Sequence, residues 1–388
     1  MRYDFDEIID RGGTNSSKWR NERVLPMWVA DMDFKAAPEI LAAAQKRLDN
    51  GVFGYTTPPR EWSEAVCGWW RRRHGVEFTP ESAIFCSGVV PAMSSAVRKF
   101  TSIGDKIVVQ APVYHLFFSC IENNGRQVLI NELKYENGEY EMDLADLENK
   151  LADPLTTLFI LCNPQNPVGK IWDRATLEKI GDMCEKYGVL VLSDEIHCDL
   201  TDPDARYVPY ASVNEKCRQN SITCVAPTKA FNIAGFQTAA VIAPNPKIRA
   251  RMSRAISTDE VGEGNAFAYV TAIAAFEKGE EWLDELRAYI YENKRLVAEF
   301  LERENLGVRL VASDATYLLW LDCSRVCEDS TILQQFLLKN AKLWLNDGNA
   351  YRGGKGFLRM NIATQRARVQ EGLNRLKYGI LEFSSASC

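Results

Sequence analysis

Two patterns of hydrophobic and polar positions alternate along the middle of the chain. Seven short segments are almost continuously apolar, which is typical of strands that are covered on both faces. They are 83–86, 106–110, 127–131, 157–162, 189–193, 222–225 and 238–243. Amphipathic stretches that predict helices lie between them, among them 93–100, 174–187 and 246–256. Strands that alternate with helices predict an α/β fold with a mostly parallel sheet of seven strands and right-handed crossovers.

The pattern changes near residue 280. Residues 280–304 predict one long amphipathic helix, which ends at Asn305-Leu306-Gly307. Strand-like segments follow at 308–312, 316–321 and 357–362. We therefore expect two domains, a large α/β domain at 48–280 and a smaller α+β domain made of residues 1–47 and 281–388.

Composition and charge exclude several classes of protein. The chain has 388 residues, of which 46% are hydrophobic and 25% charged, with a formal net charge of -6. This composition is ordinary for a globular protein, and without a basic stripe we expect no nucleic-acid partner. No apolar run approaches the roughly 20 residues that span a bilayer, and the N-terminus lacks the apolar region of a signal peptide. We expect a protein that does not enter a membrane.

The cysteines and histidines indicate the compartment. The 11 cysteines are odd in number and lack short repeated spacings, which argues against a disulfide framework. With only three histidines, a metal site is not expected. These features predict free thiols in a reducing cytoplasm.

A lysine follows one of the predicted strands. The apolar run 222–225 leads into Pro227, which stops the strand, and then to Lys229. Open α/β sheets carry their chemistry at this edge, beyond the carboxyl ends of the strands. A lysine in an apolar pocket there has a lowered pKa and can act as a nucleophile. An isolated loop lysine is more often a surface residue, so this interpretation depends on the other motifs.

Two further polar residues follow predicted strands. Asp194 comes directly after the run 189–193, where its carboxylate can pair with a cation in the crevice or simply cap the next helix. Asn166 lies in Asn163-Pro164-Gln165-Asn166-Pro167, after the run 157–162. Its amide can donate to a ligand oxygen, or the motif can serve only as a rigid turn.

Three weaker signals complete the candidate site. Ser87-Gly88-Val89-Val90-Pro91 opens a helix after the run 83–86, and backbone N–H groups at such a helix start can hold a phosphate. Tyr114, after 106–110, can stack on a planar ring or be an ordinary half-buried tyrosine. Arg359, in 357–362, can clamp a carboxylate with two hydrogen bonds or form a surface salt bridge.

Taken in order, these positions resemble the fold-type I pyridoxal-phosphate (PLP) enzymes of the aspartate-aminotransferase superfamily over nearly the whole chain. Longer motifs are similar to the MalY/PatB group of cystathionine β-lyases (C–S lyases). They are DRGGTNSSKW at 10–19, PMWVADMDF at 26–34, SDEIH at 193–197 and APTKAFNIAG at 226–235. The resemblance implies PLP as the cofactor and β-elimination of L-cystathionine or another cysteine S-conjugate to a thiol, pyruvate and ammonia.

The resemblance also implies a role for each candidate residue. Lys229 would bind the cofactor and move protons, Asp194 would pair with the pyridine nitrogen, and Tyr114 would stack on the ring. Asn166 and His197 would lie near the phenolate oxygen. The phosphate would be held by Gly88, Val89, Val90 and Thr228, and the substrate carboxylate by Arg359.

The resemblance further implies a homodimer with shared sites, in which Tyr55 reaches the phosphate of the partner subunit. Two positions depart from the wider superfamily. His197 stands where many aminotransferases carry a tyrosine, and Gln237 stands where many relatives place an arginine on the phosphate. The expected phosphate site is therefore less cationic and depends more on backbone groups, Thr228 and Tyr55.

Two alternatives stay open at the level of sequence. An aminotransferase would use the same residues, because both reactions begin with the same carbanion. A regulatory protein that binds a partner through the same fold is the alternative of another class, although retention of Lys229 and Asp194 favours an enzyme. The motifs do not identify the preferred sulfur substrate or its pathway.

Overall fold

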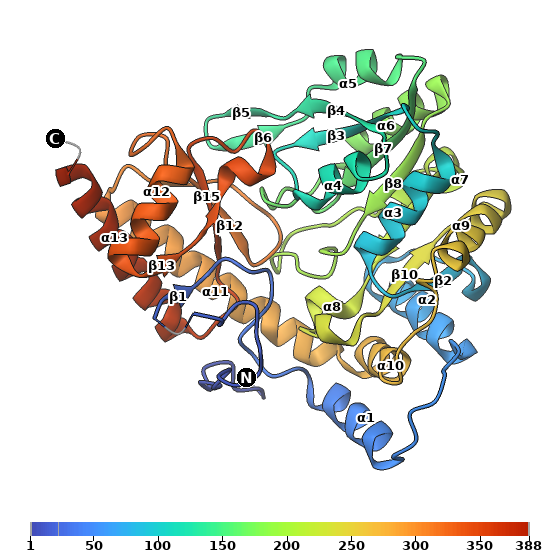
Figure 1. The fold of residues 1–388 in the computed structure, drawn as a ribbon, viewed down its shortest axis with the longest axis horizontal. Coiled ribbons are helices and arrows are strands. Elements are labelled where there is room, and N and C mark those ends of the chain that lie inside the picture. Colours follow the sequence, from blue (N-terminus) through green and yellow to red (C-terminus); the bar gives the residue numbers. More distant parts are fainter. Residues whose placement is uncertain (1, 22, 387–388) are drawn as a thin grey trace.

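A seven-stranded sheet forms the centre of the computed structural model, which describes residues 2–21 and 23–386 (Figure 1). Its strands are β2 (Ala83–Cys86), β3 (Lys106–Ala111), β4 (Gln127–Glu132), β7 (Thr156–Cys162), β8 (Leu190–Asp194), β9 (Ser221–Val225) and β10 (Ala239–Ile242). Their order is β2-β10-β9-β8-β7-β3-β4. All neighbours are parallel except that β10 runs antiparallel to both β2 and β9. The predicted mostly parallel α/β sheet is thus confirmed.

Helices cover both faces of this sheet, which explains why its strands are apolar at almost every position. Phe159 and Val191 share a buried cluster with α5 (Leu144–Leu151) and α6 (Arg174–Tyr187) on one face. Their chain neighbours Ile160 and Leu192 point the opposite way. They share a second cluster with α3 (Val89–Phe100), α4 (Leu116–Glu122) and α9 (Pro246–Thr258).

A second, four-stranded sheet lies beside the first and carries the C-terminal part of the chain (Figure 1). Its antiparallel strands, in order, are β11 (Arg309–Leu310), β12 (Leu318–Asp322), β15 (Phe357–Asn361) and β14 (Asn346–Asp347). The helices around it are α11 (Glu280–Glu304), α12 (Ser330–Phe336) and α13 (Arg366–Ala386). A parallel pair between β1 (Leu25–Pro26) and β13 (Leu343–Trp344) ties the N-terminal segment to this part.

The remaining elements are α1 (Pro38–Asp49), α2 (Arg60–His74), α7 (Glu215–Gln219), α8 (Pro227–Ala230), α10 (Ala268–Lys278) and the hairpin of β5 (Lys134–Glu136) and β6 (Glu139–Glu141). Both α1 and α2 pack against α10. Within the described ranges, no helix combines the length and the apolarity needed to cross a bilayer.

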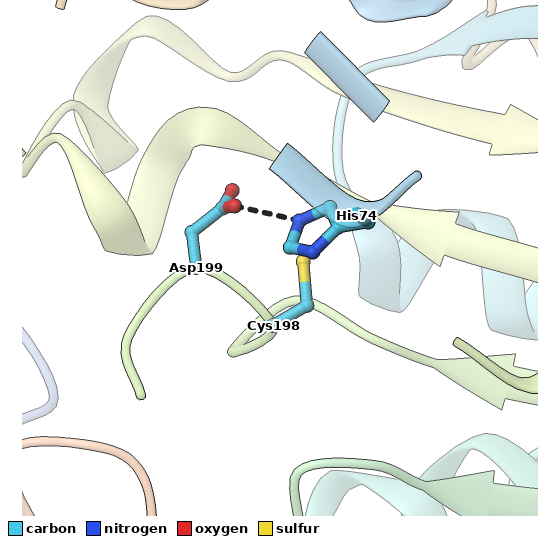
Figure 2. A group of neighbouring side chains, drawn as sticks. All are labelled: His74, Cys198 and Asp199. Atoms are coloured by element: carbon cyan, nitrogen blue, oxygen red, sulfur yellow. Dashed lines mark hydrogen bonds and ion pairs between the residues drawn. The ribbon is translucent and has the colours of Figure 1, made fainter. Parts of the chain in front are cut away.

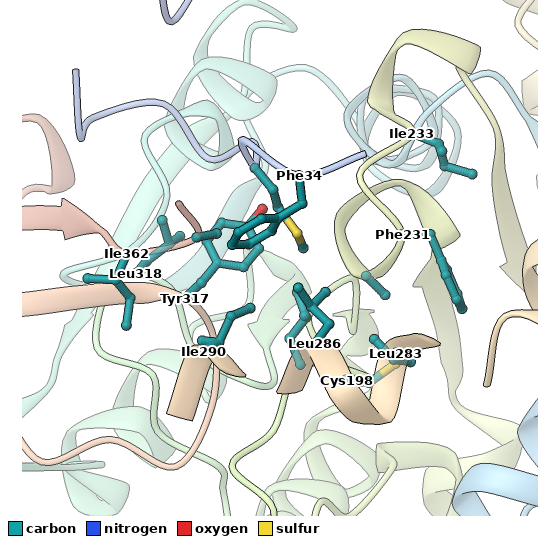
Figure 3. Close-up of a cluster of buried hydrophobic side chains, with 14 of the residues drawn as sticks. Phe34, Cys198, Phe231, Ile233, Leu283, Leu286, Ile290, Tyr317, Leu318 and Ile362 are labelled. Atoms are coloured by element: carbon teal, nitrogen blue, oxygen red, sulfur yellow. The ribbon is translucent and has the colours of Figure 1, made fainter. Parts of the chain in front are cut away.

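A buried cluster joins the two parts of the chain along α11 (Figure 3). Trp282, in its first turn, stacks on Phe231 with ring centroids 6.1 Å apart, and Phe231 directly follows α8. Two turns later, Tyr289 meets the N-terminal segment edge-on at Phe34, at 5.6 Å. The helix therefore fixes the loop after β9 and the N-terminal segment relative to each other.

Candidate active site

The carboxyl ends of the parallel strands β2, β3, β7, β8 and β9 lie at one edge of the large sheet, and a cavity of about 270 Å³ opens there. It is lined by Ala30, Ser87, Gly88, Val89, Val90, Pro91, Tyr114, Cys162, Asn166, Asp194, Ile196, His197, Thr228, Lys229, Ala234 and Gln237. Hollows of about 680 and 740 Å³ lie elsewhere, beside the β5–β6 hairpin and between α1 and α10. They are larger, but none of the residues predicted from the sequence line them. The 270 Å³ cavity is therefore the candidate site.

Lys229 lies in α8, which Pro227 begins directly after β9. Its Nζ atom donates a hydrogen bond to the carbonyl oxygen of Ala30, at 2.7 Å. Burial, and then the positive charge of Arg359, lower the pKa of Lys229 to about 8, against the opposing effect of nearby carboxylates. Near neutral pH this lysine therefore supplies an uncharged amine far more readily than a solvated lysine does.

Asp194 is the last residue of β8, between Cys162 on β7 and Cys224 on β9 in the strand register. Its Oδ1 accepts the N–H of Ile196 at 3.1 Å, and the described residues give this carboxylate no other hydrogen bond. Burial raises the pKa of Asp194 to about 7, although that N–H group and the charge of Lys229 act in the opposite direction. A cation that entered the cavity would stabilise the ionised carboxylate.

His197 follows on the same turn and is buried. Burial, and then the positive charges of Lys229 and Arg359, lower its pKa to about 3, so the imidazole is neutral. Its Nδ1 atom is buried without a hydrogen-bond partner among the described residues. Buried polar atoms are rarely left unsatisfied, so this atom is available to a ligand.

Arg359, on β15 of the second sheet, is only 3% exposed and is not among the residues that line the cavity, but it contacts Asn166, which is among them. Its Nη1 donates to Oδ1 of Asn166 and its Nη2 to the carbonyl oxygen of Trp28, both at 3.0 Å. Its Nε atom is buried and has no partner within the described ranges. The guanidinium is thus held on one side and keeps donors for a ligand. Its contact with Asn166 was not predicted from the sequence.

The start of helix α3 lines the cavity and can hold an anion. Helix α3 begins at Val89, and no side chain in the described part of the chain caps its first turn. The first N–H groups of a helix lack intrahelical acceptors and favour an anion. Thr228 and Gln237 line the same cavity.

The two tyrosines predicted to act in the site lie in different surroundings. Tyr114 lines the cavity, and burial raises its pKa to about 12, so its hydroxyl stays protonated. Tyr55 is fully exposed, in an irregular segment between α1 and α2, and is not among the residues that line the cavity.

One wall of the cavity was missed by the sequence-based prediction. It is the backbone around Ala30, and side chains from distant segments hold it. The Nδ2 atom of Asn361 donates to the carbonyl oxygens of Val29, at 2.5 Å, and of Asp31, at 2.6 Å. Tyr317 donates its hydroxyl to the Ala30 oxygen at 3.2 Å. A backbone carbonyl carries no residue-type signal, so only the unusual motif 26–34 pointed to this wall.

Charged residues of the two N-terminal motifs bind each other behind this wall. Lys18 pairs with Asp33 at 2.8 Å, and both side chains are 1% exposed. Arg11 pairs with Asp31 and Asp33, at 2.9 Å each, and the indole N–H of Trp19 donates to Asp33 at 2.8 Å. Burial alone would raise the pKa of Asp33, but Lys18 and these donors outweigh it and lower that pKa. The motifs at 10–19 and 26–34 thus form one buried ionic unit.

His74, Cys198 and Asp199 form a separate polar cluster, with ligand atoms within 4.8 Å of one another (Figure 2). The Asp199 carboxylate already accepts from the His74 ring at 2.9 Å and from the Trp69 indole at 3.0 and 3.1 Å. Burial strongly raises the pKa of the Cys198 thiol, which disfavours the thiolate that a metal needs. We interpret this cluster as a structural hydrogen-bond network.

Comparisons with known proteins agree with this geometry. Residues 23–376 match the family model for aminotransferase class I and II. The chain is 46% identical to cystathionine beta-lyase PatB of Bacillus subtilis (strain 168), over 96% of this chain and 98% of the relative. It is 31% identical to Protein MalY of Escherichia coli (strain K12), over 96% and 97%. The structure of cystalysin from Treponema denticola, which contains a pyridoxal 5'-phosphate cofactor, superposes with a TM-score of 0.95 at 33% identity, over 98% of this chain and 100% of that one.

The resemblance drawn from the motifs is therefore confirmed, and so is the fold. The chain belongs to the aminotransferase class I and II family of fold-type I PLP enzymes and, within it, to the group that contains PatB and MalY.

Proposed function

We propose that this chain is a PLP-dependent C–S lyase that eliminates the sulfur substituent of L-cystathionine or another L-cysteine S-conjugate. One water is consumed, and the products are a thiol (homocysteine from cystathionine), pyruvate and ammonia. The observation that carries this proposal is the buried Lys229 amine of lowered pKa. It shares one cavity with the buried carboxylate of Asp194, which has no direct cationic partner among residues 2–21 and 23–386. The name of PatB, a cystathionine beta-lyase, supports the type of reaction.

The groups in the cavity fit PLP, which carries an aldehyde, a pyridine nitrogen, a phenolate oxygen and a phosphate. Asp194 is a buried carboxylate that a protonated ring nitrogen would stabilise. The Oδ1 of Asn166 accepts a hydrogen bond from Arg359, so the amide N–H groups of Asn166 can donate to a ligand. The Nδ1 atom of His197 has no partner among the described residues. The uncapped start of α3 matches a phosphate. No group of the cofactor would meet an unsuitable partner here.

The residues that would hold the cofactor follow from this match. Lys229 would bind the aldehyde carbon, Asp194 would pair with the ring nitrogen, and Tyr114 would stack on the ring. Asn166 and His197, which line the cavity, would hydrogen-bond the phenolate oxygen, His197 as a neutral imidazole. The phosphate would be bound by Gly88, Val89, Val90 and Thr228.

When bound, the cofactor supplies a sink for the electron pair that deprotonation leaves on the substrate Cα. Arg359 binds the substrate carboxylate through the donors that Asn166 and Trp28 leave free. The substrate amine would first displace Lys229 from the cofactor, and the freed, neutral amine of Lys229 would then take the Cα proton as a general base. The thiolate then leaves Cβ with the bonding pair of electrons and is protonated. Water hydrolyses the remaining enamine to pyruvate and ammonia.

An aminotransferase is the second candidate, because the matching family model is named for that reaction and the same residues create the same carbanion. The reactions separate at the next proton transfer. If Lys229 returns the proton to the cofactor before the thiolate departs, transamination results.

We also propose a homodimer in which Tyr55 binds the phosphate in the partner's site. The full exposure of Tyr55, together with the exposed Val52 and Phe53 in the same segment, supports a surface that a second copy covers. Mixing Tyr55→Phe protein with Lys229→Ala protein tests this. Heterodimers would contain one site with both defects and one with neither, so activity should rise above that of either parent. Confirmed subunit exchange without a gain in activity would contradict the proposal.

The cellular compartment and the domain division are also proposals. The cysteines in the described ranges are all free thiols, and all but Cys327 are buried, which supports a reducing cytoplasm. We propose 48–280 as the large PLP-binding domain, and 1–47 with 281–388 as the small domain. Helix α1 spans this boundary and packs against α10.

The function is tested by pyruvate release from L-cystathionine. Purified protein loaded with PLP should be yellow and should form pyruvate. Lys229→Ala should lose both the absorption band of the lysine-linked cofactor and pyruvate formation. A wild-type protein that binds no PLP, or that binds it and forms no pyruvate, would refute the proposal.

A further inference from the structure

His115 lies just outside the set of residues that line the candidate active site, and we take its position as the rim of the cavity. It directly follows Tyr114, which lines the cavity, and precedes α4. Of the other two histidines, His197 is buried and His74 is bonded to Asp199, whereas His115 is exposed. Within the described part of the chain its ring nitrogens have no hydrogen-bond partner. The imidazole therefore keeps both a donor and an acceptor for a ligand.

Two aromatic rings fix the imidazole of His115 in place. The Tyr114 ring meets it edge-on with centroids 4.9 Å apart and planes at 71°. The Tyr351 ring, from the short turn between β14 and β15, meets it at 6.4 Å and 87°. Because these rings come from the two parts of the chain, His115 lies where the parts meet, next to the cavity-lining Tyr114.

The same tyrosine links His115 to the carboxylate clamp. The Arg359 guanidinium lies over the Tyr351 ring, 5.2 Å from its centroid. Partial burial, and then the charge of Arg359, lower the pKa of His115 below its ordinary value. At neutral pH the ring is therefore uncharged, on the same side of the site as Arg359.

The size of the cavity determines which part of a substrate reaches this rim. About 270 Å³ has to contain the cofactor as well as the reacting carbon atoms. A conjugate whose carboxylate binds Arg359 and whose Cα lies near Lys229 must therefore extend beyond the sulfur toward the mouth. In cystathionine that extension ends in a second ammonium and carboxylate. Arg352, which directly follows Tyr351 in the chain, is already paired with Glu122, at 2.7 Å.

We propose that His115 is a specificity-determining residue, whose imidazole hydrogen-bonds the polar end of the leaving group. This inference rests on the proposed lyase function and adds a substrate class to it. The chain should prefer cysteine conjugates whose leaving thiol ends in a carboxylate over conjugates with a short alkyl thiol. Tyr114 and Tyr351 hold the ring, and its N–H donates to the carboxylate.

The test compares two substrates on one pair of variants. His115→Phe keeps the edge-on ring contacts and removes both nitrogens, and His115→Gln restores a donor and an acceptor. A hydrogen bond to a charged group at a partly exposed rim corresponds to roughly 5- to 20-fold in kcat/KM. We expect that loss for L-cystathionine in His115→Phe, chiefly in KM, with partial rescue in His115→Gln and no loss for S-ethyl-L-cysteine. Asn123→Ala, an exposed change at the other end of α4, is the matched control.

Three outcomes would overturn the inference. An equal loss on both substrates would mean that His115 affects the fold or the chemical step. Unchanged kcat/KM on both would mean that His115 does not contact the leaving group. A wild-type enzyme that eliminates neither thiol would refute the lyase function itself, and the inference with it. That last result is distinguishable because it appears before any variant is made.

Discussion

The Nζ atom of Lys229 lies 2.7 Å from the carbonyl oxygen of Ala30, a residue 199 positions earlier in the chain. This lysine, in α8 directly after β9, is therefore in direct contact with the N-terminal segment. The Asn361 side chain holds that segment by bonding the carbonyls on both sides of Ala30. The position of the proposed catalytic lysine thus depends on three distant parts of the sequence.

Asn361→Ala should loosen this wall. Asn361 is 1% exposed, and its loss leaves the carbonyl oxygens of Val29 and Asp31 without their shared donor. We expect the free energy of unfolding to fall by about 1–3 kcal/mol, with a fall of roughly 10-fold in kcat/KM. Urea unfolding and steady-state kinetics measure the two effects. Asn374→Ala, on the exposed face of α13, should change neither. Unaltered kinetics in Asn361→Ala would show that the wall does not position Lys229.

Asp194→Asn should separate binding of the cofactor from its activation. The amide keeps the size of the carboxylate but does not stabilise a protonated ring nitrogen. We expect the yellow, lysine-linked cofactor to form, with pyruvate release from cystathionine reduced by roughly 100-fold or more. Near-normal turnover would mean that Asp194 serves only to cap the turn at Ile196.

The same substitution should change the pH dependence of the cofactor-free protein. The pKa of Asp194 is about 7 in the folded state against an ordinary 3.8, so the folded state binds more protons between these values. Folding stability must then fall as pH rises from about 4 to about 7, by on the order of a few kcal/mol, since one pKa unit is worth about 1.4 kcal/mol.

Urea unfolding of the two cofactor-free proteins at pH 5 and pH 7.5 measures this effect. Glu195, whose pKa burial also raises to about 7, is present in both, so the difference between the proteins isolates Asp194. Wild type should lose more stability than Asp194→Asn over this range, and saturation with PLP should remove the difference. Parallel pH profiles would contradict the raised pKa.

Arg359→Lys should weaken the use of substrate. A lysine keeps the charge but not the planar fork that binds a carboxylate with two hydrogen bonds. Loss of such a contact, at roughly 1.5–3 kcal/mol, implies a drop of about 10- to 100-fold in kcat/KM. Steady-state kinetics with cystathionine test this, with Arg375→Lys on α13 as the control. An unchanged kcat/KM would exclude Arg359 as the carboxylate clamp.

The sequence predicts the large sheet well for a physical reason. Strands covered on both faces are apolar at nearly every position, and turn residues end them sharply. The carboxyl ends of parallel strands share one edge of the sheet, so the sequence alone predicts that Asn166, Asp194 and Lys229 lie close together. The structure gathers all three at that edge.

Features that depend on contacts between distant segments were not predictable in this way. The hydrogen bond from Arg359 to Asn166 joins residues 193 positions apart. Neither residue type indicates which partner it will bind. The predicted strand at 308–312 is only Arg309–Leu310 in the structure, because pairing with β12, rather than side-chain pattern, sets its length. The wall around Ala30 consists of backbone groups, and the side-chain types in the sequence do not indicate where backbone groups will line a cavity.

The central claim is that a thiolate leaves Cβ faster than Lys229 returns a proton to the cofactor. The most direct measurement is the product ratio from L-cystathionine, followed in a single reaction for pyruvate, homocysteine and any keto acid that retains sulfur. We predict pyruvate and homocysteine in equal amounts, with the cofactor unchanged after many turnovers. A keto acid that retains the sulfur, with the cofactor converted to its amine form, would contradict the lyase and establish an aminotransferase.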